Sequence, residues 1–268
     1  MSPMLLAIDV GNTNIVCGVF EKDELVVSWR LATLHERTAD ELWVLVSRLF
    51  AERGIDPRRI DGVVMASVVP ALTHAVSQMV TRELDLTVLN VDAGNAGLPI
   101  RYERPAEVGA DRLVNGVAAW RLYGRPPRQI IVVDFGTATT FDALSADGTY
   151  QGGVICPGVE ISADALFQRA ARLPRVEVRR PEALIGRTTV GSIQSGIFFG
   201  YVAMVEGIVA RLRAELGAGG GCLCVATGGL ASAIAAETDV IDEVHGDLTL
   251  VGLRFVWERN EPPGRPPS

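Results

Sequence analysis

The chain reads LLAIDVGNTNI at residues 5–15 and IIVVDFGTATT at residues 130–140. Each stretch is an apolar run followed by Asp, one further residue, Gly and a cluster of small polar residues. The two acids, Asp9 and Asp134, stand one in each half of the 268-residue chain. Glycine lets backbone N–H groups approach an anion without a Cβ in the way. The repeated pattern therefore predicts a duplicated fold that grips a nucleotide between two lobes.

Strand and helix patterns repeat in the same way around the two stretches. In each half, three runs rich in Val, Ile, Leu and Phe are separated by turn residues, which predicts three antiparallel strands. Helices are expected where apolar residues recur at helical spacing, one of them after a capping box at Thr38 and Glu41. The predicted strands are 4–10, 13–20, 25–32, 62–66, 86–91, 130–135, 139–144, 149–155 and 222–227. Helices are predicted from Thr38 to Gly54 and at 71–84, 109–123, 160–171, 191–216 and 248–258.

The predicted class is α/β, with two lobes that each contain a mixed sheet flanked by helices. We expect an N-terminal lobe at 1–124 and a C-terminal lobe at 125–260. The tail at 261–268 has four prolines in eight residues and is predicted to be disordered.

Composition limits the classes of function. The apolar fraction is 48%, the net charge −7 and the pI about 5.1, which disfavours nucleic acid as the main partner. A cluster of four arginines is interrupted by apolar and acidic residues and is interpreted as a solvated loop (Arg172, Arg175, Arg179 and Arg180). Neither a signal peptide nor an apolar run of about 18 residues is visible, so we expect a cytoplasmic protein that is not in a membrane. Cys17, Cys156, Cys222 and Cys224 are too few for a disulfide framework, and structural roles are expected for them.

The first turn, residues 9–14, suits a phosphate. Asn12, Thr13 and Asn14 add side-chain donors to the backbone N–H groups. Asp9 repels phosphate, so its natural partner is a hydrated Mg²⁺ that bridges to phosphate oxygens. An Asx-type hairpin turn without a ligand is the alternative interpretation. The second turn, residues 134–140, could hold another cation and the terminal phosphates.

Five motifs occur in a fixed order over nearly the whole chain. They are IDVGNTN at 8–14, GADR at 109–112, VDFGTATTFD at 133–142, GGVICPGVEISADAL at 152–166 and IGRTT at 185–189. In these motifs the chain resembles type III pantothenate kinase, from about residue 4 to 257. That family lies in the actin, sugar-kinase and Hsp70 superfamily, so the resemblance implies duplicated ribonuclease H-like lobes of the actin-like ATPase type.

The resemblance also implies a reaction and its residues. ATP would phosphorylate the primary hydroxyl of pantothenate, which is the first step towards coenzyme A. Asp111 would be the catalytic base, Asp134 a ligand of a monovalent cation (K⁺ or NH₄⁺), and the partner a second copy in a homodimer. The ATP-binding positions would be Asp9, Val10, Gly11, Asn12, Thr13, Asn14, Ile15, Val16 and Thr137. The pantothenate-binding positions would be Tyr102, Gly109, Ala110, Asp111, Arg112 and Thr189. The long helix at 191–216 is compatible with a dimer contact or with a place in the core.

The chemistry of an alcohol acceptor agrees with these roles. A primary alcohol is a poor nucleophile at neutral pH, and a carboxylate at a helix N-terminus can orient it and accept its proton. Arg112 could hold the carboxylate or amide of the substrate, or pair with Asp111. Without the other motifs, Asp111 and Arg112 could equally be a surface pair at a helix start.

Two other functions remain open on this fold. One is a kinase of another small molecule, such as a sugar, which would also need an Asp base. The other is a catalytically silent nucleotide-binding regulator, against which the intact Asp111 and both acidic turns argue.

Overall fold

The computed structural model describes residues 3–170, 173–217 and 221–260. Arg172 and the predicted tail at 261–268 lie outside these residues. The chain folds into two compact units. Unit 1 holds the described residues up to Leu98, Glu103–Arg121 and those from Leu248 on, and unit 2 holds Pro99–Tyr102 and Leu122–Asp247.

Unit 1 is built on a five-stranded sheet with the order β3-β2-β1-β4-β5. Its strands are β1 (Met4–Val10), β2 (Asn14–Glu21), β3 (Glu24–Ala32), β4 (Ile60–Ser67) and β5 (Val88–Asn90). Strands β1 to β3 are antiparallel, whereas β4 and β5 run parallel to β1. This is the mixed sheet that the alternation of apolar runs and turns predicts.

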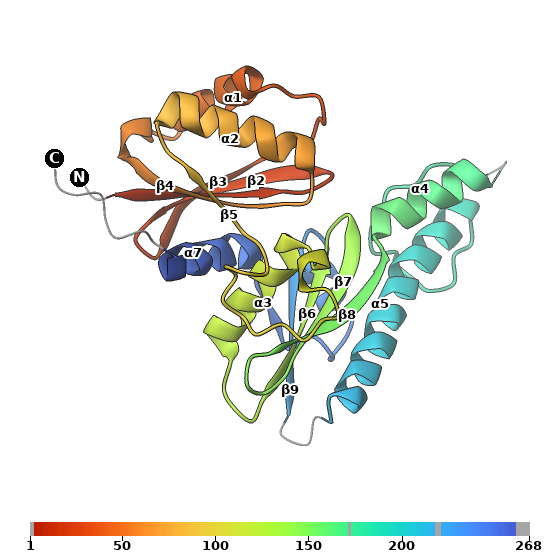
Figure 1. The fold of residues 1–268 in the computed structure, drawn as a ribbon. Coiled ribbons are helices and arrows are strands. Elements are labelled where there is room, and N and C mark those ends of the chain that lie inside the picture. The colour runs from red at the N-terminus through yellow and green to blue at the C-terminus, as the bar shows by residue number, and fades with distance from the viewer. Residues whose placement is uncertain (1–2, 171–172, 218–220, 261–268) are drawn as a thin grey trace. The chain divides into compact units, whose positions relative to one another are not determined.

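Helices cover both faces of the sheet of unit 1. Helices α1 (Ala39–Glu52) and α2 (Pro70–Leu84) lie on one face, and α7 (Leu248–Asn260) lies on the other (Figure 1). The predicted capping box begins α1, because the Glu41 amide donates to the Thr38 hydroxyl and the Glu41 carboxylate accepts from the Thr38 amide. Helix α3 (Ala110–Tyr123) contacts α7 through a hydrogen bond from Thr249 to Asn115. Each sheet face is therefore closed by an apolar helix face.

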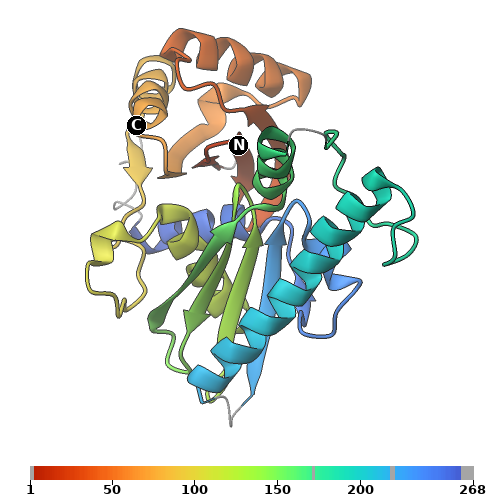
Figure 2. The ribbon, with the colours of Figure 1, turned by 90° about the vertical axis from the view of Figure 1, so that its right-hand side faces the viewer.

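Unit 2 repeats this sheet with the order β10-β9-β6-β7-β8. Its strands are β6 (Gln129–Phe135), β7 (Ala138–Leu144), β8 (Tyr150–Pro157), β9 (Cys222–Gly228) and β10 (Glu243–Val244). Helix α5 (Thr189–Glu215) crosses one sheet face, and its buried side chains share a core with β6, β7 and β9 (Figure 2). Two further helices contribute to the same core, α4 (Val159–Arg169) and α6 (Ala231–Ala235).

The two sheets have one topology. In each, three consecutive antiparallel strands are followed by two parallel strands on the other side of the first. The duplicated α/β fold predicted from the two turns is confirmed. The sequence patterns missed β10 and α6, because strands and helices of two and five residues are too short for a periodic pattern.

Three segments group differently from the predicted lobes at 1–124 and 125–260. The shortest is 122–124, which belongs with unit 2. Helix α7 packs on β1 and β4 and so belongs with unit 1, although it ends the described chain. Residues Pro99–Tyr102 belong with unit 2, because the backbones of Pro99 and Arg101 bind that of Tyr150. Sequence order alone could not show these long-range contacts.

Among the described residues, one helix, α5, is long and apolar enough to cross a membrane. It is also the core helix of unit 2, where Phe198, Val205 and Val209 are fully or almost fully buried against the sheet. A buried core helix passes the same test of length and composition, so α5 gives little support to a membrane span.

Candidate active site

The first turn connects β1 to β2 and closes on itself. The Gly11 amide donates to the Asn14 carbonyl (3.0 Å), and the Thr33 hydroxyl donates to the Gly11 carbonyl (2.7 Å). Asn12 and Thr13 are exposed at its tip. The turn is therefore shaped by its own backbone and by Thr33, the residue after β3, and it presents polar side chains to solvent.

Not every residue of the segment 9–16 has a side chain that can contact a nucleotide. Val10 and Ile15 are 0% and 2% exposed and belong to the core of unit 1. They could contact a nucleotide through the backbone only. Asp9, Asn14 and Val16 are partly accessible.

The GADR segment lies at the same edge of the sheet as the first turn. Strands β1 and β4 are parallel, so their carboxyl ends meet there, and the Val68 amide donates to the Val10 carbonyl (3.1 Å). A Cβ on Gly109 would touch Val68 at 3.8 Å and would overlap the Asp111 carboxylate. Glycine at 109 thus leaves room for that carboxylate beside the end of β4. Ligands of α/β sheets bind at such carboxyl edges.

Asp111 stands in the first turn of α3, and its environment changes its acidity. Burial raises the pKa of the Asp111 carboxyl above its ordinary value, while the Arg112 amide (2.8 Å) and the positive charge of Arg112 oppose the rise. Arg112 itself is only 7% exposed, so the alternative of an exposed surface pair is wrong for it. A half-buried carboxylate with a raised pKa at a helix start has the properties of a general base.

The second turn connects β6 to β7 and is braced from two sides. The Gly158 amide, at the start of α4, donates to the Thr137 carbonyl (3.1 Å). The Gly229 amide, after β9, donates to the Phe135 carbonyl (3.2 Å). Thr137 is exposed and Asp134 is partly accessible. Three chain segments therefore meet at the carboxyl ends of β6 and β9.

Glycine is required at both junctions. A Cβ on Gly158 would overlap the carbonyl oxygens of Gly136 and Thr137. Gly228 has a φ of +91°, and a Cβ there would lie 2.7 Å from Asp134 Oδ1. Any side chain larger than hydrogen would displace the second turn or its carboxylate.

The remaining predicted substrate residues lie elsewhere in unit 2. The Tyr102 ring lies near Gly152 of β8, where a Cβ would meet it at 3.5 Å. Thr189 is the first residue of α5 and lines a cavity of about 760 Å³. The cavity wall combines hydroxyl, cationic and apolar side chains, including Arg187, Ser192 and Ile193.

Comparison with known proteins assigns the family. The family model of type III pantothenate kinase matches residues 5–211. A type III pantothenate kinase of Moorella thermoacetica is 54% identical over 258 residues, covering 96% of this chain and 100% of that protein. One from Myxococcus xanthus is 53% identical, with 96% and 99% covered. The chain belongs to the type III pantothenate kinase family. It is therefore a kinase, and ATP use follows from the family.

Solved structures of low identity agree on the fold. A conserved putative Baf family transcriptional activator from Campylobacter jejuni superposes with a TM-score of 0.58 at 18% identity, covering 95% of this chain and 98% of that one. Component A of the (R)-2-hydroxyglutaryl-CoA dehydratase of Acidaminococcus fermentans superposes with a TM-score of 0.51 at 13% identity. This match covers 94% of this chain and 95% of that one. Both structures therefore share the duplicated α/β fold of this chain over nearly its whole length.

The roles of Gly158 and Gly228 in this kinase are visible only in the structure. The sequence predicts a strand–turn–helix corner at Gly158 and a strand-to-helix turn at Gly228. The sequence does contain a signal, because the glycines in Pro157–Gly158 and Gly228–Gly229 lie within three residues of the ends of predicted strands. Which turn they touch depends on contacts between segments far apart in the chain, such as Phe135 and Gly229, which no local pattern contains.

The carboxylates at the two turns of this kinase suit cations that are also bound by phosphate oxygens. Within the described residues, no three side chains of His, Cys, Asp or Glu gather into a metal site. Mg²⁺ in nucleotide sites commonly keeps its waters and takes one or two carboxylates plus phosphate oxygens. Asp9, near the end of β1 and beside backbone amides, fits that pattern. Asp134 has the equivalent place in β6, where its carboxylate could bind another cation.

Proposed function

We propose that this chain transfers the terminal phosphoryl group of ATP to the primary hydroxyl of pantothenate, giving 4′-phosphopantothenate, the first step of coenzyme A biosynthesis. The observation that carries the proposal is Asp111, a half-buried carboxylate with a raised pKa at the start of α3 and at the same sheet edge as the first turn. Family membership supplies the substrate.

Asp111 acts as the base of the reaction. It accepts the proton of the attacking hydroxyl, and the N-terminus of α3 favours its negative charge. Gly109 keeps the space beside its Oδ1 free of a side chain. Phosphoryl transfer has a loose transition state, so positioning of the alcohol and neutralisation of charge supply most of the rate.

The two turns have different roles in the binding of ATP. The segment from Asp9 to Val16, which contains the first turn, binds the phosphates through its amides and polar side chains, and Asp9 would hold hydrated Mg²⁺. Asp134 would hold a monovalent cation, K⁺ or NH₄⁺, and Thr137 contacts ATP. These cations supply neutralisation of the charge on the phosphates when bound.

The pantothenate-binding residues offer groups that match the substrate. Gly109, Ala110 and Arg112 belong to the base segment, and the positive charge of Arg112 suits the carboxylate or amide of pantothenate. Tyr102 and Thr189 are the other two substrate positions. The cavity beside Thr189 offers hydroxyl groups, a guanidinium and apolar walls, which match the hydroxyl, carboxylate and methyl groups of pantothenate.

The enzyme works as a cytoplasmic homodimer in this proposal, without nucleic acid or membrane as partner. Apolar side chains are exposed around α4 and the start of α5 (Ile161, Phe167, Leu184, Ile185 and Val190). Gly196, Gly200 and Ala203 lie on an exposed strip of α5 that would allow close helix approach. A second copy would cover this apolar surface.

One assay tests the reaction. Purified protein is given ATP, Mg²⁺ and K⁺ with pantothenate or with a panel of sugars, and ADP release is followed. Pantothenate-dependent ADP is expected. ADP release only with a sugar would replace the substrate, and none with any acceptor would favour a silent regulator.

The base has its own test. Asp111→Asn should lower kcat by about 10²–10⁴-fold, because the proton acceptor is lost while the shape stays. ATP binding and folding should remain. Asp40→Asn is the matched control, since Asp40 also lies in the first turn of a helix but forms an exposed ion pair with Arg82. A near-normal rate in Asp111→Asn would remove the assigned role.

A further inference from the structure

The start of α4 is fixed by one tyrosine of α5. Tyr201 is 8% exposed, and its hydroxyl donates to the Pro157 carbonyl at 2.7 Å. The same hydroxyl lies 2.6 Å from the Ser162 hydroxyl. A phenol carries one proton, so Ser162 must be the donor in that second bond. One buried hydroxyl thus ties the end of β8 to the first turn of α4.

The fixed point borders the second turn directly. Pro157 pairs with Ala138, and the next residue, Gly158, donates to the Thr137 carbonyl at 3.1 Å. The absence of a Cβ on Gly158 allows the backbone of Gly136 and Thr137 to approach this closely. A shift of Pro157 would therefore pass to Thr137 through a backbone hydrogen bond and a close contact.

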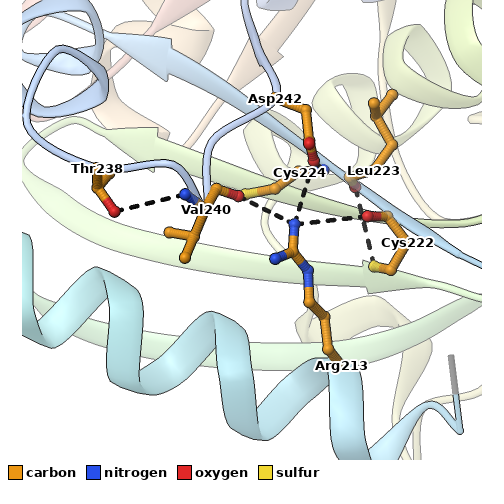
Figure 3. Close-up of polar contacts among 7 residues, drawn as sticks. All are labelled: Arg213, Cys222, Leu223, Cys224, Thr238, Val240 and Asp242. Atoms are coloured by element: carbon orange, nitrogen blue, oxygen red, sulfur yellow. Dashed lines mark hydrogen bonds and ion pairs between the residues drawn. The ribbon is translucent and has the colours of Figure 1, made fainter.

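Helix α5 is itself anchored at its far end. Arg213 donates to the Asp242 carboxylate (3.1 Å) and to the Val240 carbonyl (3.0 Å), and Asp242 also accepts from the Cys224 amide (2.7 Å; Figure 3). Between these ends, Val205 and Val209 are fully buried against the sheet. Tyr201 therefore reaches Pro157 from a helix that is held in place.

We infer that Tyr201 and Ser162 are positioning residues for ATP: they hold Thr137 and the second turn in the geometry that binds the nucleotide. This inference rests on the proposed contact of Thr137 with ATP. Burial raises the pKa of the Tyr201 phenol, so the hydroxyl remains a donor across the working pH range. Neither residue touches the reacting atoms in this scheme.

The test measures ATP binding directly, by calorimetry with Mg²⁺ present, and steady-state kinetics beside it. Tyr201→Phe should weaken ATP binding and raise KM for ATP roughly fivefold, the factor expected for about one lost hydrogen bond. KM for pantothenate should stay within about twofold, because Tyr201 does not act on that site. Tyr123→Phe is the matched control, since the half-buried Tyr123 lies at the end of α3.

Ser162 gives a second and milder variant pair. Ser162→Ala should weaken ATP binding less than Tyr201→Phe does, because the bond from Tyr201 to Pro157 remains. Ser162→Thr, which keeps the hydroxyl, should restore the binding. A purely structural role would lower the melting temperature while leaving ATP affinity unchanged, and that result would overturn the inference. Equal changes in the two KM values would overturn it as well.

A double-mutant cycle separates this inference from the proposed function. Tyr201→Phe should weaken ATP binding less in a Thr137→Ala background than in the wild type, because both changes act on one contact. Full additivity would contradict the link through Thr137. The cycle uses binding alone, so it stands even if the wild type shows no pantothenate-dependent ADP release, which would refute the proposed function only.

Discussion

The two Asp-x-Gly turns share a sequence pattern and a place in their sheets, but different contacts hold them. The first turn is closed by the bond from Gly11 to Asn14 and by Thr33 of the adjoining segment. The second turn is held by Gly158 and Gly229, which lie far from it in the sequence. The two copies therefore share the strand–turn–strand unit, but the chain segments that contact each turn differ.

The neighbours account for the different roles that we propose for the two copies. Beside the first turn lies the GADR segment, with a carboxylate that suits proton transfer. Beside the second turn lie the start of α4 and the end of β9, where the Gly158 and Gly229 amides donate to its carbonyl groups. In the proposed function, the first copy therefore binds phosphates next to the base, while the second copy keeps its shape through the bonds from Gly158 and Gly229.

The largest contrast is expected from the two acids. Asp9→Asn should lower kcat/KM for ATP by about 10²–10³-fold, because it removes a fixed charge for the cation at the phosphates. Asp134→Asn should lower kcat/KM for ATP by less, about 10–100-fold. It should also abolish the difference between the rates measured in K⁺ and in Na⁺. Rates measured over Mg²⁺ and K⁺ titrations check this. A change in the Mg²⁺ response in Asp134→Asn alone would reverse the assigned roles.

A smaller contrast is expected from two glycines. Gly158→Ala must push the Thr137 carbonyl away, and a misplacement of about 1 Å can cost about 10²-fold in rate. Gly11→Ala should cost less than about tenfold, because a Cβ there would lie 3.2 Å from the Asn14 carbonyl and needs only a small shift. Values of kcat/KM for ATP, with melting temperatures, measure both. Equal losses would show that the first turn is as dependent on close packing as the second.

Most of the fold can be predicted from the sequence because its signals are local. Apolar runs before Asp9 and Asp134, the Thr38 capping box and the helical spacing in α2 and α5 each depend on a few neighbouring residues. The site is a meeting of distant segments. Asp111 can be predicted as the base because GADR resembles a family motif. The contacts of Gly158 and Gly228 and the grouping of α7 with unit 1 depend on tertiary packing.

The pH dependence of kcat/KM should arise from Asp111, beside the first turn, and not from the second turn. Because burial raises the pKa of Asp111, kcat/KM should fall with decreasing pH at a higher pH than for an ordinary aspartate. The folded state binds that proton more tightly than the unfolded state, so this group favours folding at low pH and opposes it as pH rises through the raised pKa. Asp111→Asn should therefore match or exceed the wild-type melting temperature at pH 7.

The second copy provides the control for that profile. Asp134→Asn should keep the acid limb of kcat/KM at the same pH as the wild type, measured at saturating Mg²⁺. A shift or loss of the limb in this variant would assign the titrating group to the second turn. A lower melting temperature of Asp111→Asn at pH 7 would show that its ionised carboxylate stabilises the fold.

The smallest difference between the two copies is expected in the reactivity of the buried thiols in their sheets. Both thiols should be equally protected from a thiol reagent. Cys17 on β2 and Cys224 on β9 are 2% and 0% exposed, and burial raises the pKa of each to about 12. At pH 8 only roughly one thiol in 10⁴ of either kind would be ionised, and the thiolate is the reactive form. Native protein should therefore bind a thiol reagent at most at Cys156 and Cys222, and unfolded protein at all four, as mass spectrometry of the labelled peptides would record. Rapid labelling of Cys17 but not of Cys224 would show that the self-closed first turn opens more readily than the braced second one.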